Sequence, residues 1–248
     1  MSIAVIFAGP SLPPKLRPVD ASFDWRPPVR QGELYRAALA RPAVIGIVDG
    51  YFEVVPTVWH KEILWAMAEG IHVYGAASIG ALRAAELDSF GMRGVGRIYE
   101  AFRDGILEDG DEVAVLHGPE ELGYPPVSEA MVDIRATFAE AARAGVIAAA
   151  PATRLTEIAK GLFYKERSYA AILDAAAAAG LPAATLQAFA DWLPQGRIEQ
   201  KRQDAEAMLE AIRAHLATGA PPLRVSWRLA ETAAWQAARR AADRVLGR

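Results

Sequence analysis

Short apolar runs that each end in a small or polar residue alternate with helical patterns in the first half of the chain. The runs span residues 3–8, 43–48, 71–75 and 112–116. Runs of this length and composition are typical of buried strands. Strands that alternate with helices need crossover connections, which place the strands parallel and cover both faces of the sheet. The sequence therefore predicts a doubly wound, mostly parallel α/β sheet of the Rossmann-like or flavodoxin-like kind.

Helical patterns separate these strands and then take over the chain. Residues 56–69 predict a helix that ends at a glycine, and residues 80–87 predict another. After residue 126 the chain becomes rich in alanine, the residue with the highest helix propensity, and no strong strand pattern returns. We therefore expect an α/β core domain over residues 1–125 and an α-helical C-terminal region over residues 126–248.

Two further segments are expected to lie on the surface. Residues 13–28 contain five of the sixteen prolines and predict a loop that crosses the core. Residues 198–215 mix charged side chains with Met208, Leu209 and Ile212, a pattern that predicts an amphipathic surface helix.

Composition excludes several classes of function. The formal charge of −3 argues against a general nucleic-acid binder, which needs a basic surface to displace counterions. The chain contains no cysteine, so it cannot carry sulfur on a thiol of its own or hold a thiolate-bound metal. No apolar run approaches the roughly 20 residues of a membrane helix. We expect a cytoplasmic protein without a metal or a cofactor.

Polar residues follow each predicted strand. Ligands of open parallel sheets bind at the carboxyl ends of the strands. That rule gathers Ser11, Asp49, Ser78 and His117 at one edge, and His60 joins them from the first turns of the next helix. This edge is the predicted functional site.

Residues 75–83 give the most specific local signal, because small residues after a strand lead through a serine into a helix. This resembles half of a nucleophile elbow, in which Ser78 attacks and the amides of Ile79 and Gly80 form an oxyanion hole. Ala76 replaces the first glycine of the full motif. The alternative is that Ser78 only caps the helix, as serine often does.

A serine nucleophile needs a base and a group that orients the base. His60 or His117 is the candidate base, and Asp49 or Glu62 is the candidate orienting carboxylate. The alternatives are a partly buried helix residue for His60, a turn residue for His117 and a turn signal for Asp49 with Gly50. The predicted substrate-binding residues are Gly9, Ser11, Gly50, Ile79, Gly80 and Arg83.

Three other groups have weaker interpretations. Arg83 and Glu86 are spaced to pair on one helix, which favours a structural role. The glycine-rich residues 91–97 carry two arginines that could grip an anion. The acidic run 108–112 lacks the spacing of a calcium loop and is read as a solvated turn.

The residues just described resemble a known family. The stretch from Asp49 to Ala66, beginning Asp-Gly-Tyr-Phe-Glu-Val-Val-Pro, looks like the signature of TfuA-like proteins. Residues 75–87 and 91–98 resemble its continuation, and residues 7–12 also fit. The resemblance covers residues 3–145 and leaves the helical tail outside.

The resemblance implies an accessory protein for a YcaO-type enzyme, which uses ATP to activate a backbone amide oxygen during thioamide formation in a peptide or protein. Two roles are open. The chain releases sulfide from a thiocarboxylated sulfur-carrier protein of the ThiS type, by acyl chemistry at Ser78, or it is a non-catalytic docking module that activates the YcaO enzyme. A third, weaker hypothesis is a nucleotide-binding α/β protein.

Overall fold

A computed structural model describes residues 3–53 and 55–245 of the chain. The chain divides into two compact units: Met1–Glu108 with Arg202–Arg248, and Asp109–Lys201. The sequence suggested a single boundary near residue 125. In the structure the chain leaves the first unit earlier and returns to it for its last segment, which no local pattern could indicate.

A five-stranded parallel sheet forms the centre of the first unit. Its strands are β1 (Ala4–Phe7), β2 (Phe23–Arg26), β3 (Val44–Ile47), β4 (His72–Gly75) and β5 (Arg93–Gly94). The strand order is β2-β1-β3-β4-β5, and all neighbours pair in parallel. This is the flavodoxin-like order, whose topological switch point lies between β1 and β3. The predicted fold class is confirmed.

Helices connect these strands and complete the first unit. They are α1 (Glu33–Ala38), α2 (His60–Ala68), α3 (Ile79–Leu87), α4 (Arg97–Arg103), α9 (Gln200–Ala217) and α10 (Ala233–Val245), with 3-10 turns at Pro14–Leu16 and Asp88–Phe90. The predicted helices at 56–69 and 80–87 are confirmed as α2 and α3.

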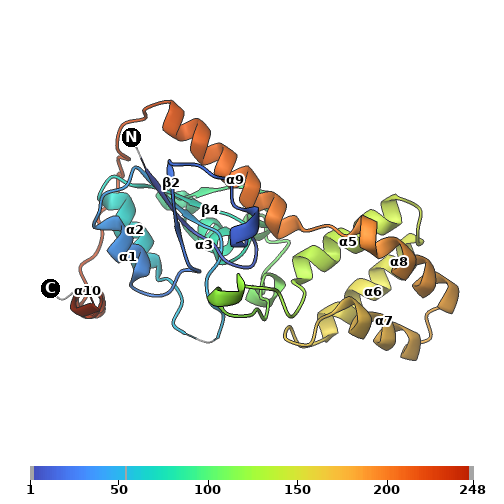
Figure 1. Cartoon of the computed structure of the whole chain (residues 1–248). Coiled ribbons are helices and arrows are strands. Elements are labelled where there is room, and N and C mark those ends of the chain that lie inside the picture. Colours follow the sequence, from blue (N-terminus) through green and yellow to red (C-terminus); the bar gives the residue numbers. More distant parts are fainter. Residues whose placement is uncertain (1–2, 54, 246–248) are drawn as a thin grey trace. The chain divides into compact units, whose positions relative to one another are not determined.

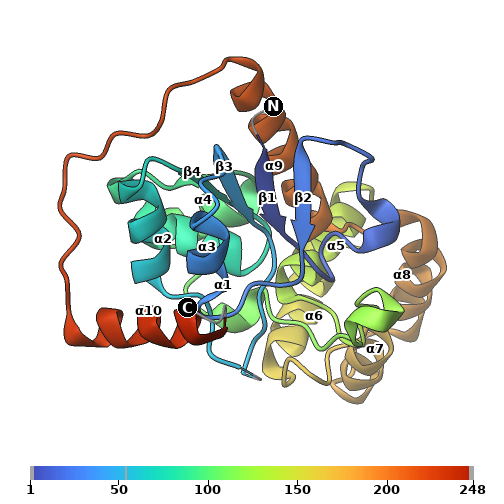
Figure 2. The same cartoon turned by 60° about the vertical axis from the view of Figure 1, so that its left-hand side comes forward.

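Two different layers cover the sheet, because alternate strand residues point to opposite faces. Val5, Ile45 and Val73 belong to a core cluster that includes residues of α1, α2 and α3. Ile6 and Val44 face the other way and pack with α9 (Figures 1 and 2).

The helix α9 is therefore part of the core of the first unit. Ala205, Met208, Leu209 and Ile212 are at most 2% exposed. A Cβ at Gly46 of β3 would lie 3.0 Å from Ile212 Cδ1, so the missing side chain makes room for this helix. The predicted helix exists, but its apolar side is buried against the sheet rather than left at the surface.

Two strand predictions need correction. Residues 13–28 were expected to form a loop, yet Phe23–Arg26 forms the edge strand β2. Only Phe23 of this strand is buried, Asp24 and Trp25 are partly exposed and Arg26 is exposed, so the segment lacks the apolar run of a central strand. Residues 112–116 were expected to form a strand, but Gly110–Glu112 is a 3-10 turn, and Glu112 is turned inward to pair with Arg135 of another helix.

The second unit is helical, as the alanine-rich pattern predicted. It contains α5 (Met131–Arg143), α6 (Ala149–Gly161), α7 (Tyr169–Ala178) and α8 (Ala183–Gly196), preceded by the 3-10 turns Gly110–Glu112 and Glu120–Leu122. Phe138, Tyr169 and Phe189 lie at the centre of its core. Among the described residues, no helix has the length and apolar composition needed to cross a membrane.

Candidate functional site

The register of the sheet brings three loops out side by side. Phe7 of β1 pairs with Ile47 of β3, and Ile47 pairs with Gly75 of β4. The residues that follow these three therefore leave the sheet at the same edge. Of the predicted edge residues, the structure brings together those that follow β1, β3 and β4.

Asp49 fastens the loop after β1. It is 1% exposed, and its Oδ2 accepts hydrogen bonds from the backbone N–H groups of Gly9 (2.9 Å) and Ser11 (3.0 Å). Its Oδ1 accepts a hydrogen bond from Ser11 Oγ at 2.6 Å. Both carboxylate oxygens are thus occupied within the switch point. Asp49 shapes the edge and does not orient a histidine, so that part of the sequence hypothesis needs correction.

Glycines let the backbones approach closely around this edge. A Cβ on Gly80 would overlap the carbonyl oxygen of Ile47, and one on Gly75 would overlap the carbonyl oxygen of Gly80. A Cβ on Gly50 would lie 2.9 Å from Ile79 Cγ2. The start of α3 is therefore pressed directly against the ends of β3 and β4.

Ser78 lies at the N-cap position of α3, behind a strained turn. Ala77 has φ of +66°, and the N–H of Ser78 donates to the carbonyl oxygen of Ala76 at 2.8 Å. A residue with positive φ spanned by such a bond forms a γ-turn of the rare, strained type. Backbone strain of this kind is concentrated at functional sites in proteins.

The hydroxyl of Ser78 makes no cap hydrogen bond to the helix. Its carbonyl oxygen instead accepts hydrogen bonds from the amides of Ala81 and Leu82. The side chain is therefore not used as the simple cap that the alternative hypothesis required. Ser78 is 8% exposed. The amide of Gly80, one of the two predicted oxyanion donors, is directed at the carbonyl oxygen of Val48 at 3.4 Å, a long contact.

His60 is paired with Glu86, a carboxylate that the sequence predicts to pair with Arg83. Its Nε2 lies 2.8 Å from Glu86 Oε2, and Arg83 Nη1 donates to the same oxygen at 2.6 Å. Burial opposes ionisation of Glu86, but the hydrogen bond from His60 and the charge of Arg83 lower its pKa overall. Glu86 follows Ser78 by eight residues, about 12 Å along the helix axis. The imidazole is therefore directed towards the C-terminal half of α3.

Arg83 has a second, structural contact. Its side chain is buried, and its Nε donates to the carbonyl oxygen of Val58 at 3.2 Å. This joins α3 to the segment that leads into α2. The contacts agree with the structural interpretation of Arg83 rather than with direct substrate binding.

Glu62 also has a structural position. Its carboxylate is 1% exposed and accepts hydrogen bonds from the amides of Gly32 (2.8 Å), Tyr35 (3.2 Å) and Trp59 (3.2 Å). Burial raises the pKa of Glu62, although these three amides act in the opposite direction. Glu62 joins the starts of α1 and α2 and does not orient a histidine.

His117 belongs to the second unit and does not follow a strand of the sheet. Its Nδ1 lies 2.8 Å from the carbonyl oxygen of Gly118, and its ring packs edge-on against Tyr124 at 5.8 Å. The expected strand before it is absent, so the argument that placed His117 at the sheet edge fails.

An acidic side chain of the protein itself, Asp204, binds beside the glycine-rich segment 91–97. Asp204 of α9 accepts a hydrogen bond from the amide of Ile98 at 2.8 Å, at the start of α4. Arg93 donates to the hydroxyl of Tyr74 at 2.7 Å. Sequence reasoning missed Asp204, since its partner lies 106 residues away. In the part of the chain described, no cluster of three or more histidine or acidic side chains is arranged to hold a metal ion.

Comparison with known proteins supports one family. Residues 49–168 match the family model described as TfuA-like protein, and a search of curated proteins found no match. The match begins at Asp49, where the resembling signature begins, and extends beyond residue 145 to residue 168. Residues 7–12 lie outside it. Residues 49–168, which include the loop after β3 and the strained turn before Ser78, match the TfuA-like family, in agreement with the resemblance seen in the sequence.

Proposed function

We propose that this protein is an accessory partner of a YcaO-type enzyme in thioamide formation, and that the carboxyl edge around Ser78 receives the thiocarboxylate end of a ThiS-type sulfur-carrier protein. The observation that carries the proposal is the packing of Gly75 and Gly80, which holds Ser78 at the switch-point edge behind a strained turn. In the proposal, the glycine-ended tail of the carrier reaches Ser78 where the strained turn leaves the end of β4.

The proposed chemistry is acyl transfer from sulfur to oxygen. Ser78 Oγ attacks the thiocarboxylate carbon, so a carbon–oxygen bond forms and the carbon–sulfur bond breaks. The departing sulfide takes the hydroxyl proton. Water then cleaves the acyl-serine ester, which regenerates Ser78 and leaves a carboxylate on the carrier. The partner enzyme consumes the released sulfide.

The test uses the full chain and a thiocarboxylated ThiS-type carrier. We expect sulfide release together with conversion of the carrier thiocarboxylate to a carboxylate, measured by mass spectrometry. Ser78→Ala should abolish both, while Ser89→Ala, a substitution at an exposed serine after the same helix, should leave them unchanged. Circular dichroism checks that both variants fold. Release by Ser78→Ala at the wild-type rate would exclude the serine as nucleophile.

A docking role is the second candidate, and specific contacts favour it. Asp49 is saturated by the loop after β1, and His60 is paired with Glu86, so neither group is positioned as the catalytic partner that was expected. A docking module would raise the activity of the YcaO enzyme without any chemistry of its own.

The two candidates differ in a reconstituted reaction supplied with free sulfide, which bypasses sulfide release. A docking module still stimulates the YcaO enzyme there, with or without the Ser78 hydroxyl, whereas a chain that only releases sulfide gives no stimulation. The interface would include the proline-rich loop, where Val19 is fully exposed, and the solvent side of α9, where Glu206 is exposed. Val19→Asp with Glu206→Arg should then reduce complex formation in pull-down experiments. A wild-type chain that releases no sulfide but stimulates the enzyme would establish docking alone.

A further inference from the structure

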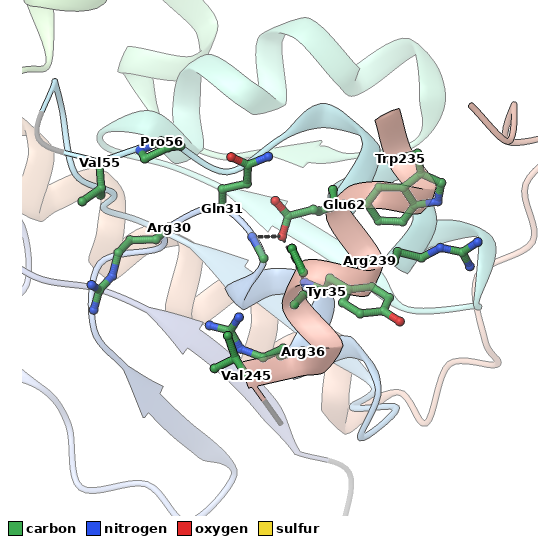
Figure 3. A pocket seen from close by; sticks show the side chains of 14 residues that line it. Arg30, Gln31, Tyr35, Arg36, Val55, Pro56, Glu62, Trp235, Arg239 and Val245 are labelled. Atoms are coloured by element: carbon green, nitrogen blue, oxygen red, sulfur yellow. Dashed lines mark hydrogen bonds between the residues drawn. The ribbon is translucent and has the colours of Figure 1, made fainter. Parts of the chain in front are cut away.

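A cavity lies in the first unit, and none of its lining residues belongs to the Ser78 edge. It has a volume of about 350 Å³, and its walls come from the start of α1, the segment before α2, and α10 (Figure 3). That volume lies at the lower end of the range for small-molecule sites. Nothing in the proposed function uses this cavity.

Three arginines line the cavity: Arg30 and Arg36 from α1 and the residues just before it, and Arg239 from α10. Arg30 and Arg36 share a single carboxylate, that of Glu33, at 3.4 and 3.8 Å. Both distances are longer than a direct hydrogen bond. These two guanidinium groups can therefore exchange a loose contact for a direct one with an incoming anion. Arg239 is held more firmly, by Glu231 at 3.0 Å.

Glu62 is the only acidic residue among the described lining residues. Its carboxylate is turned to the amides of Gly32 and Tyr35, and Figure 3 draws the first of these hydrogen bonds. The amide donors offset part of the negative charge that Glu62 presents to a bound anion, and burial raises the pKa of Glu62.

The remaining walls are apolar and partly aromatic. Tyr35 and Trp235 pack edge to face with centroids 5.8 Å apart, and both rings border the cavity. Ala238 and Ala242 of α10 are small, which leaves the space open beside them. The cavity thus offers positive charge together with a flat apolar surface.

We propose that this cavity binds a small organic anion whose carboxylate or phosphate group is held by Arg36 and Arg30 and whose apolar body packs against Tyr35 and Trp235. Since α10 supplies one wall, the ligand also stabilises its docking. That helix follows residues 218–232, which form no helix or strand. It contacts α1 through the ring of Trp235 against Tyr35 and through Tyr35 Oη, which donates to Asp243 Oδ1 at 3.2 Å.

Two fluorescent probes of similar shape test the role of charge. Anilinonaphthalene sulfonate carries an anionic group, and N-phenyl-1-naphthylamine does not. We expect the wild-type chain to bind the anionic probe at least tenfold more tightly. Arg36→Gln should lower the affinity for the anionic probe at least tenfold and leave the affinity for the neutral probe unchanged, as expected for loss of a charge-assisted hydrogen bond.

Two further variants identify the site. Arg26→Gln, which removes an exposed arginine of the same unit paired with Asp24, should change neither affinity. Ala238→Phe fills the cavity and should block both probes while the melting temperature is retained. Competition by 1-naphthoate and 1-naphthyl phosphate then distinguishes the two head groups. Equal binding of both probes to the wild type, an unchanged anionic probe in Arg36→Gln, or failure of both competitors would overturn the proposal.

Discussion

The two units of this protein handle buried polar groups in opposite ways. In the first unit, Asp49 and Glu62 are buried and accept most of their hydrogen bonds from backbone amides, so each carboxylate holds loops in position. In the second unit, polar side chains instead form ion pairs with one another. Arg167, which is 1% exposed, donates a hydrogen bond to Asp111 Oδ2 at 2.5 Å. Lys160 donates a hydrogen bond to the other oxygen of the same carboxylate at 2.5 Å.

This contrast separates groups that shape a site from groups that stabilise the fold. A carboxylate that organises backbone amides at a sheet edge creates a shaped surface next to solvent. In the second unit, the opposite charges are occupied by one another. Both candidate ligand sites described above lie in the first unit, and we expect the ion network of the second to be structural. Three experiments test this contrast.

The largest effect is expected in the second unit. Arg167→Met leaves Asp111 with only Lys160 and removes the donors that Nε supplies to the carbonyl oxygens of Ala159 and Leu162. Arg167 is buried whereas Asp111 is partly exposed, so the carbonyl oxygens that lose the Arg167 donors carry most of the loss, about 3 to 5 kcal/mol of unfolding free energy in sum. Urea unfolding followed by circular dichroism measures the loss. Arg154→Met, at an exposed pair with Glu157, should cost less than about 0.5 kcal/mol. Equal losses in the two variants would refute the structural role of the network.

A somewhat smaller effect is expected at the edge of the first unit. Gly80→Ala places a Cβ against the Ile47 carbonyl oxygen, so α3 must move away from the sheet. We expect a loss of about 3 kcal/mol, at the upper end for overpacking. Gly161→Ala is the matched control, because a Cβ there meets no atom within 4 Å. It should leave stability unchanged or raise it by up to about 1 kcal/mol. A fully stable Gly80→Ala variant would show that the close packing of the edge is dispensable.

The smallest effect on stability is expected at Asp133, a buried carboxyl group of the second unit. Burial raises the pKa of Asp133 to about 6, although the charge of Lys201 and a hydrogen bond from the Lys201 amide act against the shift. The folded state holds this proton between pH 4 and 6, where the unfolded chain has lost it. The contribution of Asp133 to stability therefore falls as pH rises through this window.

Asp133→Asn removes this pH dependence and keeps an oxygen that accepts the Lys201 amide. Between pH 4.5 and 7, the wild type should lose about 2 kcal/mol relative to the variant, from 1.36 kcal/mol for each pKa unit. Urea unfolding at the two pH values measures the difference. Glu157→Gln, at an exposed position, provides the control. If the wild type and Asp133→Asn change in parallel, the raised pKa of Asp133 is wrong.

Much of the fold could be predicted from the chain alone. Three of the four expected strands exist, as do the helices that follow two of them, because apolar runs ended by small residues are local signals. The strand β2 escaped detection because Phe23–Arg26 is short and half polar. Residues 112–116 were wrongly predicted as a strand because Glu112 is buried by pairing with Arg135 and Lys160, which depends on distant helices.

The candidate site was predictable in part for the same reason. The rule for parallel sheets placed Ser11, Asp49 and Ser78 at a common edge, and the register of β1, β3 and β4 agrees with it. The partners of these residues could not be predicted. His60 pairs with Glu86, and Asp49 is saturated by Ser11 and Gly9, because side-chain contacts depend on distances that sequence spacing does not contain.

Consecutive residues alone encode the alternation of strands and helices, the glycines at close approaches and the signature that begins at Asp49. Three features depend on the folded chain: α9 covers the second face of the sheet, Asp204 bonds the start of α4 from 106 residues away, and α10 completes a cavity beside α1. These contacts join segments that are distant in the chain, and an amphipathic pattern shows that a side chain will be buried or paired without showing which segment buries or pairs it.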